Sequence, residues 1–187
     1  PIFSQWSVDS LINVCANDAV SNFKTKTMFV NYSNWELYDI TTQSSTTGLL
    51  SLERNTIKVA TVKNIAYFGG GQYGPFTGPV YTKNIDVYDF NSNTWTLKKL
   101  SKAREIGAAA SVGNIILFAG GRSAINMYNT VDIFNVKTGT STTAKLSKAR
   151  TNIAVGVNGN KVVFAGGWFF DFSYNRPTSN AVDIYDA

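Results

Sequence analysis

The sequence predicts an all-β protein built from repeated four-stranded antiparallel sheets, and two observations support this prediction. The first is an internal repeat: Leu-Ser-Lys-Ala-Arg occurs at 100–104 and again at 146–150, and each copy leads into an apolar stretch that ends in Phe-Ala-Gly-Gly. The second is local: short runs rich in Val, Ile, Phe and Tyr are bounded by Asn, Gly, Thr and Ser, which is typical of strands joined by turns. No apolar periodicity of about 3.6 residues persists long enough to predict a helix.

Two landmarks keep the same spacing along the chain. Arginines that open a run of small or β-branched residues are Arg54, Arg104 and Arg150. Aromatic residues that precede glycines are Phe68, Phe118 and Phe164. Both series are separated by 50 and then 46 residues, and self-similarity with a period near 50 is typical of propellers or arrays. A third landmark, an acidic or amide residue beside an aromatic one, recurs at 37–39, 87–89, 133–135 and 184–186.

The first repeat, residues 1–50, is degenerate. In its register Cys15 stands at the arginine position, and Asn31-Tyr32 replaces the glycine pair. The later repeats keep the landmarks and occupy 51–100, 101–146 and 147–187. Because the repeats are contiguous, we treat 1–187 as one domain.

Each unit is predicted to contain four antiparallel strands, which the third repeat illustrates, and the last repeat, 147–187, is expected to end just after its third strand. Residues 106–112 are small because a first strand would lie nearest a crowded axis, and 115–119 form the continuous apolar run expected of a strand covered on both faces. Glycines follow because the chain must turn through conformations that a Cβ would forbid. Residues 130–136 alternate in polarity, and after a turn rich in Asn and Gly a fourth strand completes the unit. In the second repeat this last strand carries Trp95, which is expected to pack between sheets.

The order Phe-(Ala/Gly)-Gly-Gly, then Tyr-Asp or its equivalent, then Thr94-Trp95, at a period near 50, resembles the kelch repeat of β-propellers. The resemblance is strong over 51–187 and weak over 1–50. It implies an all-β kelch-type β-propeller with four blade-equivalents, either a closed four-blade ring or an arc of a larger propeller. In a closed ring, a strand around Trp6 would complete the last blade and remove an exposed sheet edge. Because kelch propellers include both enzymes and binding modules, the resemblance alone does not assign a function.

Composition excludes several classes of function. The chain has no histidine, which removes the commonest general base and transition-metal ligand, and Cys15 is the only cysteine, so no internal disulfide can form. We therefore expect no metal and no cofactor; copper oxidases of kelch architecture, for example, use two histidines. No apolar segment is long enough to span a membrane. The net charge of +5 favours acidic partners, but no reading motif accompanies it, so we expect no nucleic-acid partner.

Antiparallel order places two kinds of loop on one face, namely those joining strand four to strand one and those joining strand two to strand three. This face is predicted to bind ligands, because rigid scaffolds mount binding residues on loops. In kelch domains that bind acidic peptides, arginines at the start of the first strand face the pocket, and Arg forks grip carboxylates. The resemblance implies this role for Arg54, Arg104 and Arg150. The loops add Arg122, Tyr73, Tyr81, Trp168, Phe170, Tyr174 and Arg176.

Each of these predictions has a structural alternative. The three repeat arginines can instead pair with backbone or with acidic groups of the adjoining repeat. The loop aromatics can pack against their own sheet rather than form an exposed patch. Cys15 is expected to be a small buried hydrophobe, since no histidine exists to activate it.

These features together predict a non-catalytic interaction module whose basic, aromatic-rimmed face binds a protein, an acidic peptide or an anionic glycan. The alternatives are a kelch-fold sugar-modifying enzyme of mutarotase type, and a structural subunit that oligomerises or associates with further propeller blades. The sequon Asn31-Tyr-Ser33 favours a secreted or lumenal location. The opening residues 1–6 lack an initiator Met and a basic leader, so any targeting signal is expected to lie outside this sequence.

Overall fold

The computed structural model describes residues 10–11, 19–170 and 175–187, and every regular element among them is a β-strand. Three predictions fall on residues outside these ranges: the strand around Trp6, the environment of Cys15 and the contribution of Tyr174 to the loop face. The predicted all-β class with repeated antiparallel sheets is confirmed.

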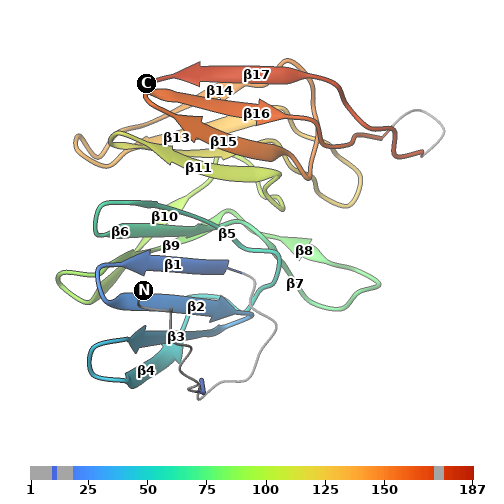
Figure 1. Cartoon of the computed structure of the whole chain (residues 1–187). Coiled ribbons are helices and arrows are strands. Elements are labelled where there is room, and N and C mark those ends of the chain that lie inside the picture. Colours follow the sequence, from blue (N-terminus) through green and yellow to red (C-terminus); the bar gives the residue numbers. More distant parts are fainter. Residues whose placement is uncertain (1–9, 12–18, 171–174) are drawn as a thin grey trace, which may run out of the picture.

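Four main sheets follow one another along the chain (Figure 1), and we number them 1 to 4. Sheet 1 consists of β1 (Ala19–Phe23), β2 (Lys26–Asn31), β3 (Asn34–Asp39) and β4 (Ser44–Leu49). Sheet 2 consists of β5 (Lys58–Val62), β6 (Ile65–Gly69), β9 (Asn84–Asp89) and β10 (Thr94–Lys99). Sheet 3 consists of β11 (Ala108–Val112), β12 (Ile115–Ala119), β13 (Thr130–Asn135) and β14 (Ser141–Lys145). Sheet 4 consists of β15 (Ala154–Asn158), β16 (Lys161–Ala165) and β17 (Val182–Asp186).

Each main sheet is an antiparallel meander in chain order, and each lies within one predicted repeat. A small ribbon, β7 (Gln72–Tyr73) with β8 (Val80–Tyr81), lies in the loop between β6 and β9. The first strand of the third repeat begins at Ala108 rather than at Ile106 as predicted. The difference arises because Ile106 buries its side chain between sheets 2 and 3, while the backbone of Glu105 bridges to a loop residue instead of to β12.

Within the described ranges the hydrophobic core forms three clusters, each lying between two consecutive sheets. Side chains alternate along a strand, so each sheet has a preceding-side face, which packs on the sheet before it, and a following-side face, which packs on the sheet after it. In β12, Phe118 and Ile116 belong to the preceding-side face, whereas Leu117 and Ala119 belong to the following-side face. This explains why the second strand of each repeat is a continuous apolar run.

The first strands β1, β5, β11 and β15 lie next to one another in chain order (Figure 1). Residues at or just before their starts, including Ala19, Ile57, Gly107 and Ile153, line one shared hollow of about 280 Å³. Small side chains are required there: a Cβ added to Gly107 would lie 2.9 Å from a backbone nitrogen of the following loop. The four sheets therefore turn their first strands toward a common side.

The contact between sheets 1 and 2 is aromatic. The ring of Trp95 lies 5.7 Å from that of Trp35, 4.8 Å from that of Tyr88 and 5.9 Å from that of Phe68. Trp95 thus packs between the two sheets, as predicted from its repeat position. Ring pairs at such separations favour association beyond the area that they bury.

Replacing the repeated phenylalanine should destabilise the fold strongly. The side chain of Phe118 is fully buried between sheets 2 and 3, so Phe118→Ala should lower the free energy of unfolding by about 3–5 kcal/mol. The matched control is Phe76→Ala, because Phe76 is 99% exposed, and its effect should stay within about 0.5 kcal/mol. Urea unfolding followed by circular dichroism measures both. Equal effects of the two substitutions would contradict the sheet-on-sheet core.

Candidate functional site

The arginine of the third repeat is held entirely inside the protein. Arg104 is 0% exposed, its Nε donates to the Gly120 carbonyl at 2.7 Å, and its Nη2 donates to the Phe118 carbonyl at 3.1 Å. Its Nη1 forms an ion pair with Asp132 at 2.8 Å. The other oxygen of this carboxylate accepts the N–H of Ser101 at 2.8 Å. Burial lowers the pKa of Arg104, and Asp132 opposes that shift by favouring the charged guanidinium.

The same arrangement recurs in sheets 2 and 4. Arg54 and Arg150 are both 0% exposed, and they pair with Asp86 at 2.7 Å and with Asp183 at 2.8 Å. The N–H groups that bind these two carboxylates belong to Ser51 and Ser147. Each arginine therefore joins the loop before a sheet to the second and third strands of that sheet.

Sequence reasoning missed the acidic partners, although a signal was present. Each acid opens the pattern acid–aliphatic–aromatic on the third strand, and the instances are Glu36-Leu-Tyr, Asp86-Val-Tyr, Asp132-Ile-Phe and Asp183-Ile-Tyr. In sheet 1 the acid persists: Glu36 is buried and accepts a hydrogen bond from the Ser45 hydroxyl at 2.6 Å.

This geometry favours the structural alternative for the three repeat arginines. Their guanidinium groups have no exposed surface, and they donate to main-chain carbonyls and to a carboxylate. The carboxylate belongs to the same sheet as the arginine rather than to the adjoining repeat. We therefore look for ligand-binding groups elsewhere on the loop face.

The glycine pairs connect each sheet to the arginine of the next one. The N–H of Gly71 donates to the Arg104 carbonyl at 3.0 Å, and the N–H of Gly121 donates to the Arg150 carbonyl at 2.8 Å. A Cβ added to Gly70, which has a φ of +67°, would lie 2.7 Å from the same Arg104 oxygen. Glycine is needed here both for backbone conformation and for close approach.

A cavity of about 640 Å³ on the loop face receives side chains from the loops of all four sheets. Tyr32 comes from the β2–β3 turn of sheet 1, Phe76 and Tyr81 from the β6–β9 loop, Arg122 from the β12–β13 loop and Arg176 from the β16–β17 loop. Three of the predicted site residues, Tyr81, Arg122 and Arg176, are thus brought together. Burial raises the pKa of Tyr81, with a further contribution from Glu105, so its hydroxyl keeps its proton at neutral pH.

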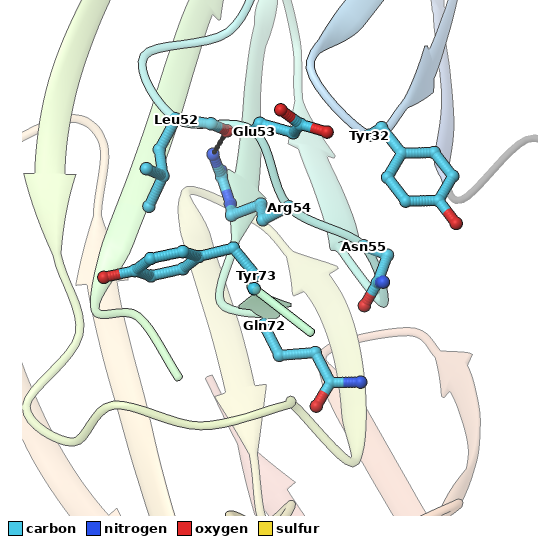
Figure 2. Close-up of a pocket in the computed structure, with 8 residues that line it drawn as sticks. Tyr32, Leu52, Glu53, Arg54, Asn55, Gln72 and Tyr73 are labelled. Atoms are coloured by element: carbon cyan, nitrogen blue, oxygen red, sulfur yellow. Dashed lines mark hydrogen bonds between the residues drawn. The ribbon is translucent and has the colours of Figure 1, made fainter. Parts of the chain in front are cut away.

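A second hollow of about 450 Å³ adjoins this cavity and shares Tyr32, Asn55 and Gln72 with it. Figure 2 shows the amide groups of Asn55 and Gln72 pointing to the same side, while the Arg54 guanidinium turns toward the Leu52 carbonyl, to which it donates at 3.1 Å. The predicted site residue Tyr73 lines this second hollow and not the larger cavity.

Residues at the same position of successive repeats anchor the start of each loop. The residue after each glycine pair or triplet is Gln72, Arg122 or Trp168, and each forms an antiparallel bridge with the residue that follows the repeat arginine. The bridge partner of Arg122 is Glu105, whose carboxylate also binds the Arg122 Nε at 2.8 Å. The buried arginines therefore fix the backbone from which the exposed binding candidates project.

Four predicted residues form one cation–aromatic cluster. The rings of Trp168 and Phe170 meet edge to face at 5.3 Å. The Arg176 guanidinium lies 5.0 Å from the Trp168 ring, and that of Arg122 lies 6.0 Å from it. Arg176 is exposed, and the structure gives it no acidic partner within the described part of the chain. The cluster thus presents a cation held over aromatic rings at the cavity edge.

These features define an all-β protein of repeated antiparallel sheets with an arginine-bearing, aromatic loop face. Models of known protein families give no match to the chain, and no curated protein matches it either. Among the described residues, no three Asp, Glu, Cys or His side chains gather as a metal site would require. The described residues also contain no helix that could cross a membrane.

The carboxylates paired with the repeat arginines should make the fold sensitive to acid. Burial acts to raise the pKa of Asp183, but the Ser147 N–H and the Arg150 guanidinium outweigh it and hold that pKa below its usual value of 3.8. A carboxyl whose pKa is lower in the folded state stabilises the fold above its unfolded pKa, and this contribution is lost as the pH falls through the folded pKa.

We therefore expect Asp183→Asn to lower the urea midpoint at pH 7 and to flatten its fall as the pH drops below about 4, where the wild-type midpoint falls because the pH passes through the lowered folded pKa of Asp183. The control is Asp186→Asn, which removes only an exposed pair with Lys161 and a contact with Asn160. Parallel pH profiles for wild type and Asp183→Asn would contradict the pairing.

Proposed function

We propose that the chain is an arc of a kelch-type β-propeller, and that its loop face is a non-catalytic module that binds an acidic peptide or an anionic glycan. Repeated sheets with adjacent first strands support the propeller arrangement, as does the hollow that these strands share. The observation that carries the binding proposal is the cavity to which all four sheets contribute.

The size and lining of this cavity suit an anionic ligand. Ligand sites in proteins usually enclose about 300–1,000 Å³, and this cavity of about 640 Å³ lies within that range. Arg176 is the cation best placed to bind a carboxylate or sulfate, because Glu105 already offsets the charge of Arg122. Tyr32, Phe76 and Tyr81 supply rings against which a peptide side chain or a sugar can pack.

The enzyme alternative finds less support in the same lining. A sugar-modifying site needs carboxylates that converge on the reacting atoms. The described residues around the larger cavity include no Asp or Glu, and those around the adjoining hollow include only Glu53. Binding without chemistry is therefore the function that this face supports best.

The test uses two probes, a poly-glutamate peptide and a sulfated heparin oligosaccharide, each titrated at low and high salt. We expect one of them to bind and to weaken as salt rises, because exposed charges are screened. The double substitution Arg122→Gln with Arg176→Gln should weaken binding about 10- to 100-fold. This corresponds to the loss of one hydrogen bond to a charged group, worth roughly 1.5–3 kcal/mol, because Glu105 already offsets the charge of Arg122.

The matched control is Lys63→Gln with Lys137→Gln, which removes the same charge from turns at the opposite ends of the strands. At 0.1 M salt or above it should leave the affinity within about twofold of wild type, because strands of five residues or more, at about 3.3 Å per residue, separate its charges from the loop face by more than the Debye length of about 10 Å. Equal weakening by the two variants would mean that net charge alone attracts the probe. Failure of both probes to bind the wild-type chain would overturn the proposed function.

A further inference from the structure

Sheet 4 exposes a face that every other sheet buries. On its following-side face Val182 is 58% exposed and Ile184 is 62% exposed. At the matching positions of sheet 3, Val131 is 5% exposed and Ile133 packs against the cluster that sheet 4 covers. The open face of sheet 4 therefore has the apolar character of an inter-sheet face without a sheet against it.

The repeat arginine of sheet 4 also makes fewer hydrogen bonds than those of sheets 2 and 3. Nε of Arg54 and Arg104 donates to the first glycine carbonyl after β6 and β12, but Nε of Arg150 has no hydrogen-bond partner among the described residues. In sheets 2 and 3 the next glycine, Gly71 or Gly121, donates its N–H to the carbonyl of the arginine of the following sheet. This difference agrees with the exposed following-side face of sheet 4, on which none of the described sheets packs.

Sheet 1 carries the complementary residue pattern at the other end of the row, and on this face Val20 is 47% exposed whereas Glu36 is buried. Its cross-strand row is Val20–Phe29–Glu36. The rows that pack on a preceding sheet elsewhere have the same character, and they are Val59–Phe68–Asp86, Ala109–Phe118–Asp132 and Val155–Phe164–Asp183. The preceding-side face of sheet 1 thus keeps the residue pattern with which sheets 2, 3 and 4 cover their neighbours.

A second pair of positions extends this likeness. Ile40 occupies the position in sheet 1 that Phe90 occupies in sheet 2. Each residue directly follows the third strand of its sheet and donates its N–H to a carbonyl of the turn before the second strand. Phe90 is 3% exposed and packs on Phe23 of the sheet before it, at 5.9 Å between rings. Ile40 is 61% exposed. Its side chain is positioned to pack on a preceding sheet in the same way.

We propose that the following-side face of sheet 4 binds the preceding-side face of sheet 1 in a second copy of the chain, head to tail. Among the described residues the core clusters join only consecutive sheets, so no cluster links sheets 1 and 4 of one molecule. The new contact would repeat the register of the three internal ones. Two arcs of four main sheets would supply eight, which is within the roughly four to eight blades of propellers.

Head-to-tail contacts close into a ring if the rotation allows it and otherwise continue as an open assembly. The proposal rests on the arc arrangement proposed above and does not depend on which ligand the loop face binds. The binding titrations and the association test below can therefore fail independently.

The test is sedimentation velocity of the full chain over about 1–100 μM, the range of ordinary specific associations. Wild type should associate, whereas Ile184→Lys and Ile40→Lys should each sediment as monomers, with apparent dissociation constants raised at least tenfold. The matched control is Ile125→Lys, in the β12–β13 loop, where Ile125 is 87% exposed. It should associate like wild type. All four proteins should share one circular dichroism spectrum, because each substitution is at an exposed position.

Mixing the variants tests the polarity of the contact. Ile184→Lys retains the unaltered face of sheet 1, and Ile40→Lys retains the unaltered face of sheet 4. In an equimolar mixture these two unaltered faces can bind each other, so association should be recovered. A wild-type chain that is monomeric at the highest concentration would overturn the proposal. Association that Ile184→Lys abolishes and Ile40→Lys leaves intact would overturn it too, because it would mean that sheet 4 pairs with itself.

Discussion

An ion pair between a buried loop arginine and a third-strand aspartate is the interaction on which the loop faces of sheets 2, 3 and 4 depend. Burying a charge is costly unless it is paired and hydrogen-bonded, and removing one partner of such a pair costs about 3–5 kcal/mol. Arg104 meets this requirement with the main-chain carbonyls of Phe118 and Gly120 and with Asp132. The loop before the sheet cannot move away from the sheet without leaving a buried charge unpaired.

The same arginine joins one sheet to the one before it. Its side chain points into its own sheet, while its carbonyl accepts the N–H of a glycine in the preceding sheet. Glycine is required at the neighbouring position, Gly70, because a Cβ there would lie 2.7 Å from the Arg104 carbonyl oxygen. The segment around each repeat arginine thus both attaches the loop to its own sheet and connects that sheet to the one before it. Residues on either side of it, such as Glu105 and its bridge partner Arg122, acquire fixed positions at the cavity.

The repeats and most strands were predictable because two landmarks keep one spacing and because the apolar runs are short and bounded by turn residues. The direction of the arginine side chains was not predictable from those landmarks. An arginine before a strand can face a ligand or turn back into the sheet, and the deciding residue, Asp132, lies 28 positions further along the chain. The acid–aliphatic–aromatic pattern contains that residue, but only its geometry shows that the acid faces the arginine.

The candidate cavity was partly predictable. Arg122, Tyr81 and Arg176 were selected as loop residues, and the structure brings them to one cavity. Tyr73 was selected on the same grounds but lines the adjoining hollow. In the β7–β8 ribbon Tyr81 pairs with Gln72, and neighbouring residues of a strand point to opposite faces, so Tyr73 and Tyr81 point to different sides. The role of Tyr32 was missed, since it stands in the degenerate repeat where the glycine pair is replaced. Loop length and loop direction are not periodic, so repeat spacing carries no information about them.

A double-mutant cycle on Arg104 and Asp132 tests the central claim most directly. Arg104→Met and Asp132→Leu should each lower the free energy of unfolding by about 3–5 kcal/mol, and the double variant should lose roughly 2–3 kcal/mol less than their sum. The same cycle on the partly exposed pair of Arg122 and Glu105 should give a coupling of about 1 kcal/mol or less. Additive losses at Arg104 and Asp132, with a coupling below about 0.5 kcal/mol, would contradict the claim that this pair holds the loop face.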